Sequence, residues 1–244
     1  MIEVKKVLVT GANGYVGNYI LKTMAKQYPT IHMLGMSRRG KLREGETAMP
    51  SNVSFVAGDC LKPETFEHHL SDTDSVIHCV GSLFESRTYE RSLLALNRDT
   101  CINVARLHQK YALENNQKRT FVMVSASRAP FFAPQYLTAK QEAEKFLQEE
   151  CPDLKVTILR PGVIVSREER LWSVPLGLVC NYYDFMWTRF YSKIPIEWYK
   201  KALVKVIPDR ATNLTTLTDI AIHGALGQTE QVGFNRDDFV HWEQ

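Results

Sequence analysis

The chain has 244 residues, 30 of them basic and 27 acidic, which gives a formal net charge of +3. This length suits one large α/β domain with helices on both faces of a sheet. Because no run of like charges stands out, the sequence does not favour a nucleic-acid surface. No stretch approaches the ~18 uninterrupted apolar residues that a spanning helix needs, so we expect no transmembrane segment.

Five cysteines are spread along the chain without any C-x-x-C spacing. That distribution argues against a disulfide framework and against zinc, so we expect no metal site. The first predicted strand starts a few residues after Met1, which leaves no room for a signal or transit peptide. A cytoplasmic location is the simplest expectation, although an internal address or a presequence already removed would also fit.

Short apolar runs alternate with helical patterns through the first two thirds of the chain. Strands are predicted at residues 6–10, 31–36, 53–56, 75–80, 120–124 and 155–159. Helices are predicted at 16–26, 63–70, 89–114 and 136–149. This alternation predicts an α/β fold with a doubly wound parallel sheet and helices on both of its faces.

Beyond residue 162 the pattern changes. The segment 171–199 is crowded with aromatic residues, namely Trp172, Tyr182, Tyr183, Phe185, Trp187, Phe190, Tyr191, Trp198 and Tyr199. We expect no further βαβ unit here, and we expect a last helix at 218–226.

A glycine-rich segment, Gly11-Ala12-Asn13-Gly14-Tyr15-Val16-Gly17, lies where the first predicted strand turns into the first predicted helix. In that context the first glycine makes the tight turn, the second lets the backbone approach a pyrophosphate, and the third permits close helix packing. The helix start then offers free N–H groups to the anion. A glycine-rich turn without a ligand is the alternative. We predict a Rossmann-type dinucleotide site formed by Gly11, Asn13, Gly14, Tyr15, Val16 and Gly17.

The cofactor preference is predicted from the end of the second strand, where the chain reads Ser37-Arg38-Arg39. An acidic residue there would accept hydrogen bonds from the adenosine ribose, but none occurs before Glu44. Two guanidinium groups suit a 2′-phosphate instead. We therefore expect NADP(H) to be preferred, with NAD(H) also able to bind. The alternative is that both arginines are simply solvated in a surface loop.

Candidate catalytic residues follow the fifth predicted strand. Tyr136 and Lys140 are four apart on a predicted helix and so share a face. A nearby ammonium, with an oxidised nicotinamide above it, would lower the pKa of the tyrosine for acid/base work. Ser125 and Ser127 could each polarise a substrate carbonyl. The alternative is that Tyr136 packs the helix start while Lys140 is solvated.

Together these motifs resemble the extended and atypical short-chain dehydrogenase/reductases. The matching segments are residues 11–17, Gly58-Asp59, His78-Cys79-Val80-Gly81, Asn97, Ser125-Ala126-Ser127, Tyr136-Leu137-Thr138-Ala139-Lys140 and Arg160-Pro161-Gly162. The resemblance implies that Asp59 lies beside the adenine, with Cys60 next to it among the cofactor-binding residues. It also implies that Val80 and Gly81 line the cofactor and that Pro161 and Gly162 border the nicotinamide. The loop before Tyr136 is shorter than in active members.

Within this family, the segments 37–41, 58–66, 78–85 and 136–144 are similar to a mitochondrial atypical branch. That branch includes a short-chain-dehydrogenase-like protein associated with coenzyme Q biosynthesis and the NAD(P)H-binding accessory subunit of respiratory complex I. The resemblance implies a place on the matrix side of the mitochondrial inner membrane, with other subunits of a membrane complex as partners. The aromatic segment 171–199 would then meet a partner or the membrane interface, unless its side chains only roof a pocket and fill the core.

Two regions and two main functions are predicted. Residues 1–165 form the NAD(P)-binding Rossmann core, and residues 166–244 form a small C-terminal helical and aromatic region packed on the same domain. The first function is that of an accessory subunit whose bound NADP(H) stabilises the fold. The alternative is an active NADP-dependent reductase or dehydrogenase that uses Tyr136 and Lys140 on a carbonyl or alcohol. A third hypothesis is a regulatory sensor whose dinucleotide occupancy switches a partner interaction.

Overall fold

The computed structural model describes residues 3–84, 88, 92–129, 133–189 and 210–242. Its main feature is a seven-stranded parallel sheet with the strand order β3-β2-β1-β4-β5-β6-β9. These strands are β1 (Lys6–Thr10), β2 (His32–Ser37), β3 (Val53–Ala57), β4 (Ser75–His78), β5 (Arg119–Val124), β6 (Leu154–Leu159) and β9 (Gly233–Phe234). A separate parallel pair consists of β7 (Ile164–Val165) and β8 (Thr212–Asn213). The predicted doubly wound α/β fold is confirmed.

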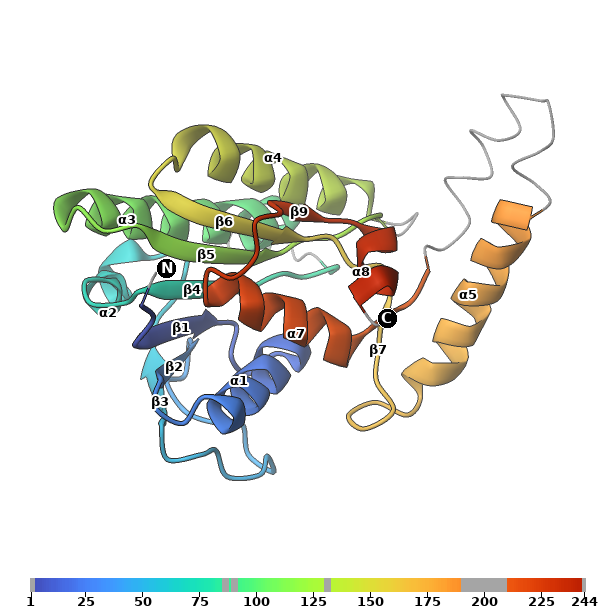
Figure 1. The fold of residues 1–244 in the computed structure, drawn as a ribbon, viewed down its shortest axis with the longest axis horizontal. Coiled ribbons are helices and arrows are strands. Elements are labelled where there is room, and N and C mark those ends of the chain that lie inside the picture. The colour runs from blue at the N-terminus through green and yellow to red at the C-terminus, as the bar shows by residue number, and fades with distance from the viewer. Residues whose placement is uncertain (1–2, 85–87, 89–91, 130–132, 190–209, 243–244) are drawn as a thin grey trace.

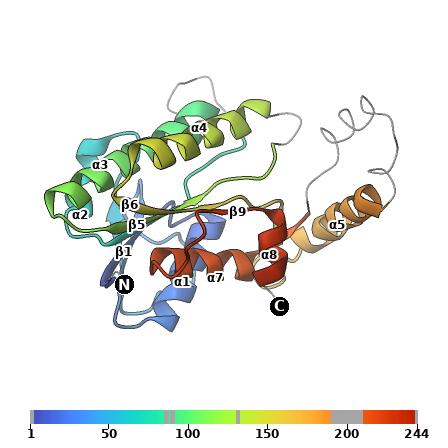
Figure 2. The same cartoon turned by 45° about the horizontal axis from the view of Figure 1, so that its top comes forward.

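Helices cover both faces of the sheet (Figures 1 and 2). One face carries α1 (Tyr15–Gln27) and α7 (Leu214–Ala225), which contact each other. The other face carries a 3-10 turn η1 (Pro63–Thr65), α2 (Glu67–Leu70), α3 (Thr100–Glu114) and α4 (Pro134–Glu150). This arrangement gives the three layers expected of a parallel sheet.

The hydrophobic core is divided between the two faces of the sheet. On β1, Val7 and Val9 pack with Leu217 of α7, while Leu8 packs with Leu147 of α4 on the opposite face. All five side chains are buried. Successive side chains of a strand point to opposite faces, so a strand covered on both sides needs apolar residues at every position. That is why β1 is a continuous apolar run.

The C-terminal part adds a short strand and a helix that the sequence pattern does not predict. After α7 the chain forms β9, which pairs in parallel with β6 and extends the sheet. The strand was not predicted because β9 has only two residues, too few to show a pattern. Helix α7 begins at Leu214 rather than at residue 218, since the Asn213 side chain accepts a hydrogen bond from the Thr215 N–H (3.3 Å). It is not the last helix, because α8 (Arg236–Trp242) follows.

The long helix predicted at 89–114 begins later. Residues 89–91 lie outside the described residues, and a π-helical turn, η3 (Ala95–Asp99), precedes α3. Its Asn97 side chain is fully buried and donates to the carbonyls of Ser82 and Leu93, both at 2.8 Å. The Asn97 Oδ1 accepts from the Ser82 N–H (3.1 Å). This asparagine therefore fixes the loop that follows β4.

Helix α5 (Ser173–Arg189) projects sideways from the layered core (Figures 1 and 2). It packs against β7, and it leaves several large apolar side chains exposed. None of the described helices is both long enough and apolar enough to cross a bilayer.

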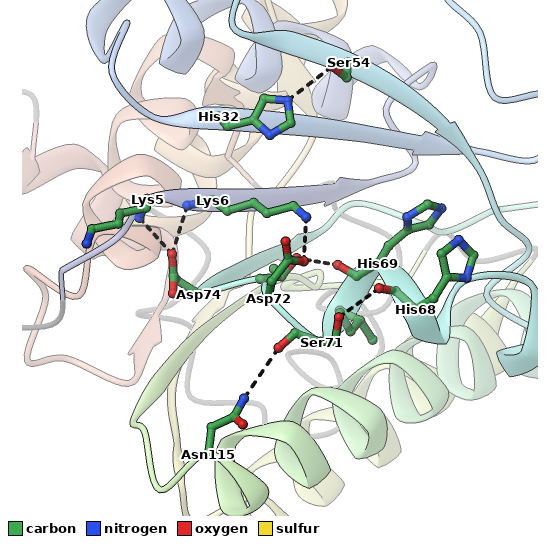
Figure 3. A network of polar contacts seen from close by, with 12 residues as sticks. Lys5, Lys6, His32, Ser54, His68, His69, Ser71, Asp72, Asp74 and Asn115 are labelled. Carbon is green, nitrogen blue, oxygen red and sulfur yellow. Dashed lines mark hydrogen bonds and ion pairs between the residues drawn. The ribbon is translucent and has the colours of Figure 1, made fainter.

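A polar network joins segments at the amino ends of the strands (Figure 3). The Asp74 carboxylate accepts from the backbone N–H groups of Lys5 (2.8 Å) and Lys6 (2.9 Å), and the Lys6 ammonium pairs with Asp72 (2.5 Å). In parallel sheets ligands bind at the carboxyl ends of the strands, which is the opposite edge. We therefore regard this network as a structural clamp between β1 and the start of β4.

Candidate functional site

The loops after β1 and β4 meet at the point where the strand order reverses. From β1 the chain passes to β2 and β3 on one side, and then returns to β4, β5 and β6 on the other. Gly11 has a φ of +71°, and a Cβ on it would lie 3.0 Å from the backbone carbonyl of Cys79. A crevice at such a switch point is the usual place for a dinucleotide.

The rest of the glycine motif brings helix α1 close to this crevice. A Cβ on Gly17 would lie only 2.5 Å from the Gly11 carbonyl oxygen, so any other residue would push the helix away from the loop. Gly14 caps α1 without a side-chain hydrogen bond, and the first turn contains no acidic residue. The N–H groups at the start of α1 therefore have no side-chain cap, as is usual where a helix start binds an anion.

Asn13 links the glycine loop to the end of β2. Its Nδ2 donates to Ser37 Oγ (3.0 Å) and to the Lys41 carbonyl (2.9 Å). Its Oδ1 is buried and has no hydrogen-bond partner among the described residues. Arg38 and Arg39 are exposed in the same turn, and neither forms an ion pair within the described part of the chain. Both guanidinium groups are available to a ligand.

The loop after β3 carries Asp59 and Cys60. Asp59 is half-buried, and its Oδ1 accepts from the Leu61 N–H (3.1 Å). Cys60 points into the core, and burial raises the pKa of its thiol to about 12. The Cys60 side chain is therefore not available to a ligand. The Cys60 carbonyl accepts a hydrogen bond from the Asn103 side chain (3.0 Å).

Lys140 is buried beneath the loop after β4. Its ammonium donates to the carbonyls of Val80 (3.1 Å) and Val124 (3.0 Å), at the ends of β4 and β5. A Cβ on Gly81 would lie 3.2 Å from the Lys140 Nζ and 2.8 Å from the Asn97 Oδ1, so the glycine lets the loop after β4 pack closely on both side chains. Burial lowers the pKa of Lys140.

Tyr136 lies one helical turn before Lys140 on α4 and is half-buried. Burial raises the pKa of its hydroxyl to about 12. The sequence pattern predicted the opposite direction on the assumption that Lys140 and an oxidised nicotinamide act on the phenol. In the structure the Lys140 ammonium is hydrogen-bonded to two carbonyls, and the pKa of Tyr136 responds to burial alone.

The two candidate serines are both engaged within the protein. The Ser125 hydroxyl donates to the Glu144 carboxylate, whose other oxygen accepts from Arg160 Nε (2.8 Å) and Nη2 (2.6 Å). The Ser127 hydroxyl donates to the Pro161 carbonyl (3.1 Å). Pro161 is buried, and the neighbouring Gly162 N–H donates to Thr212 Oγ1 (3.0 Å). Their catalytic roles stay predictions.

The residues that form this site lie within a known protein family. A family model described as NAD(P)H-binding matches residues 11–174, from the first glycine of the motif to the start of α5. The chain belongs to this NAD(P)H-binding family.

Solved structures of family-like proteins share the fold. A short-chain dehydrogenase from Leptospira borgpetersenii with bound NAD+ superposes with a TM-score of 0.64 at 15% identity, covering 95% of this chain and 90% of that one. The Bordetella bronchiseptica enzyme WbmH in complex with NAD+ gives a TM-score of 0.62 at 16% identity, covering 94% and 74%. The predicted resemblance to extended short-chain dehydrogenase/reductases is confirmed, and the match to the NAD(P)H-binding family supports a nicotinamide cofactor.

Two curated relatives extend the comparison. One is the MIOREX complex component 2 of Saccharomyces cerevisiae, 22% identical over 65% of this chain and 72% of that protein. The other is a UDP-glucose 4-epimerase of Vibrio cholerae, 26% identical over 66% of this chain. The match covers 52% of the epimerase, so the chain spans about half of that enzyme's length.

The structure of this NAD(P)H-binding protein shows three residues that the sequence patterns did not single out as functional. The buried Glu144 and the half-buried Arg160 form an ion pair behind Ser125, and the i,i+4 step from Lys140 to Glu144 could have indicated the first of them. Arg170 lies with its Cζ 3.9 Å from the centre of the Tyr15 ring. No sequence pattern pointed to Arg170, because it contacts a helix 155 positions earlier in the chain.

Proposed function

We propose that the protein is an NADP(H)-binding accessory subunit of a mitochondrial inner-membrane assembly, either respiratory complex I or the coenzyme Q machinery. In this role bound NADP(H) stabilises the fold, and α5 supplies the surface that meets a partner. The observation that carries the proposal is that α5 exposes large apolar side chains and buries small ones.

Helix α5 buries small residues and exposes large apolar ones. Ser173 and Cys180 are 2% and 1% exposed, whereas Leu178, Tyr182 and Phe185 are 66%, 60% and 59% exposed. A surface helix of a free-standing protein normally shows the reverse, with its apolar stripe toward the core. A contiguous apolar patch of this kind marks a protein or membrane contact.

The candidate catalytic groups support a role without turnover. Ser125, Ser127 and Lys140 already hold hydrogen-bond partners inside the protein, and the pKa of Tyr136 is raised. The likeness to a protein named as a complex component points the same way, and the resemblance of the sequence to the mitochondrial branch supplies the location and the choice of assemblies.

The crevice residues fit a nicotinamide dinucleotide. A Cβ on Gly11 or Gly17 would collide with neighbouring backbone, so only glycine allows the close approach that a pyrophosphate needs. The buried Asn13 Oδ1 has no partner among the described residues and could accept a hydrogen bond from the cofactor. The exposed Arg38 and Arg39 would hold the 2′-phosphate that distinguishes NADP(H), whose nicotinamide carries a transferable hydride. Asp59, Val80, Gly81 and Gly162 would line the rest of the cofactor.

Gentle, detergent-based purification of the native protein tests this proposal. Co-eluting proteins and bound nucleotide are identified together by mass spectrometry. We expect stoichiometric subunits of the respiratory or coenzyme Q machinery together with retained NADP(H). A free monomer or dimer that exchanges NADP(H) readily would contradict the accessory role.

One observation favours the alternative, an active reductase. Tyr136 and Lys140 lie one turn apart on α4, at the carboxyl ends of β4 and β5. In that role the Tyr136 hydroxyl donates a proton to a substrate carbonyl oxygen, while Lys140 holds the nicotinamide ribose and stabilises the phenolate left behind. Tyr136→Phe would then abolish NADPH-dependent carbonyl reduction but leave NADPH affinity unchanged. No loss of turnover across the pH range would exclude this role.

A further inference from the structure

The turn between β7 and α5 is a fixed structure. The Ser166 hydroxyl accepts from the N–H groups of Glu168 (3.2 Å) and Glu169 (3.1 Å), and the Ser173 hydroxyl donates to the Arg170 carbonyl (2.6 Å). Ser166 and Ser173 are 5% and 2% exposed. Residues 166–170 therefore present their side chains in a defined geometry.

This turn docks on helix α1, the helix that starts at the glycine motif. Arg170 stacks on Tyr15, and Glu168 accepts a hydrogen bond from the Tyr19 hydroxyl (3.4 Å). Tyr15 and Tyr19 are four apart and share one face of the helix, while Glu168 and Arg170 are two apart on the turn. The two pairs fix the register between the turn and the helix.

The Arg170 contact brings a cation to the positive end of α1. Tyr15 is the first residue of the helix, and helical side chains lean toward the N-terminus, so the guanidinium stacked on its ring lies near the start of α1. A cation at that end is electrostatically unfavourable. No acidic residue lies in the first turn of α1, and the nearby carboxylates of Glu168 and Glu169, which face Tyr19 and Tyr15, form no ion pair with Arg170 among the described residues. An anionic ligand would resolve this conflict.

We propose that Arg170 is a cofactor-binding residue that contacts the pyrophosphate of the dinucleotide from the side opposite the glycine loop. The proposal rests on the nicotinamide site assigned above and adds to it a residue from the C-terminal region. The Tyr15 ring orients the guanidinium. Arg170 then adds a positively charged side chain to the backbone N–H groups at the start of α1. The pyrophosphate is common to NADP(H) and NAD(H), so Arg170 serves both.

Cofactor affinity tests this role. Dissociation constants for NADPH, NADH and adenosine 2′-monophosphate are measured by calorimetry or competition for the wild type and for Arg170→Ala. A lost charge-assisted contact predicts about tenfold or greater weakening for NADPH and for NADH alike. Adenosine 2′-monophosphate has no pyrophosphate, so its affinity should stay within about twofold of the wild type.

Arg167→Ala is the matched control, because Arg167 is an exposed arginine of the same turn without a ring contact to Tyr15. It should leave all three affinities unchanged. Arg170→Gln, which keeps the length of the side chain without its charge, should reproduce the loss if the charge is what matters. Thermal unfolding without ligand should be similar for all variants, since Arg170 is exposed.

Two results would overturn the proposal. Unchanged NADPH and NADH affinities in Arg170→Ala would show that the guanidinium does not touch the cofactor. An equal loss for adenosine 2′-monophosphate would show that it acts elsewhere in the site. If the wild type itself bound neither NADPH nor NADH, the cofactor assignment would fail before any variant was compared.

Discussion

The proposed preference for NADP(H) depends on two exposed side chains, Arg38 and Arg39, at the end of β2. Their guanidinium groups lie in a turn that Asn13 fastens to the glycine loop through Ser37 Oγ and the Lys41 carbonyl. The turn is therefore held in place before any ligand arrives, and a 2′-phosphate would meet two charges whose backbone is already ordered.

Replacing both arginines with alanine should weaken NADPH binding far more than NADH binding. We expect about tenfold or more for NADPH, since a charge-assisted phosphate contact is lost, and little change for NADH. Titration calorimetry at low and high salt would measure both affinities. An equal loss for the two cofactors would rule out a 2′-phosphate contact.

The ion pair of Glu144 and Arg160 has a structural role that can be measured. Glu144→Gln removes the counter-charge of the half-buried Arg160 guanidinium, which keeps its hydrogen bond to Asn235, and we expect a loss of about 2 to 3 kcal/mol in the free energy of unfolding. Glu142→Gln is the matched control on the same helix, because Glu142 pairs with Arg98 near the surface (2.8 Å). That change should cost less than about 1 kcal/mol. Similar losses in denaturant titrations of the two variants would contradict this assignment.

Among the elements, those with long apolar patterns were predictable from the sequence and the short ones were not. The first six strands of the main sheet and the glycine turn were predicted because burial on both faces and a tight turn demand particular residues locally. The two-residue strands β7, β8 and β9 exist only because α5 and α7 bring them beside their partners. The contact between Arg170 and Tyr15 is set by the same tertiary arrangement, so no local pattern could reveal it.

At the scale of one element, α5 offers a direct test of the partner surface. Leu178→Glu with Tyr182→Glu places charges on side chains that are already exposed, so the folded protein should keep its thermal stability and its cofactor affinity. We expect the same variant to lose its co-purifying partners, because a charge in an apolar interface is strongly unfavourable. Leu113→Glu on α3, where the leucine is 60% exposed, is the control and should retain them. Unchanged partner recovery in the α5 variant would place the interface elsewhere.

For the whole molecule, two buried histidines set a dependence of stability on pH. His78 and His108 lie between the sheet and α3, and burial lowers the pKa of each to about 3. Their folded pKa lies below the unfolded value of about 6.5, so protons bind the unfolded chain more readily as the pH falls. Each histidine should therefore cost about 2 kcal/mol of stability between pH 7 and pH 5.

Urea unfolding at pH 7 and pH 5 would measure this loss. His108→Gln removes one titrating group and should reduce the pH dependence by about half while lowering stability at pH 7. A variant whose stability falls with pH as steeply as the wild type would show that other groups are responsible.

The contact between α1 and α7 has a consequence for how the molecule is made. Helix α7, which covers one face of the sheet together with α1, begins only at Leu214, far along the chain from α1. Helices α3 and α4, which cover the other face, follow one another in the order of elements. The α1/α7 face can therefore close only through a contact of large sequence separation, so we expect it to form later in folding than the α3/α4 face and to be the face that exposes apolar surface in a partly folded chain.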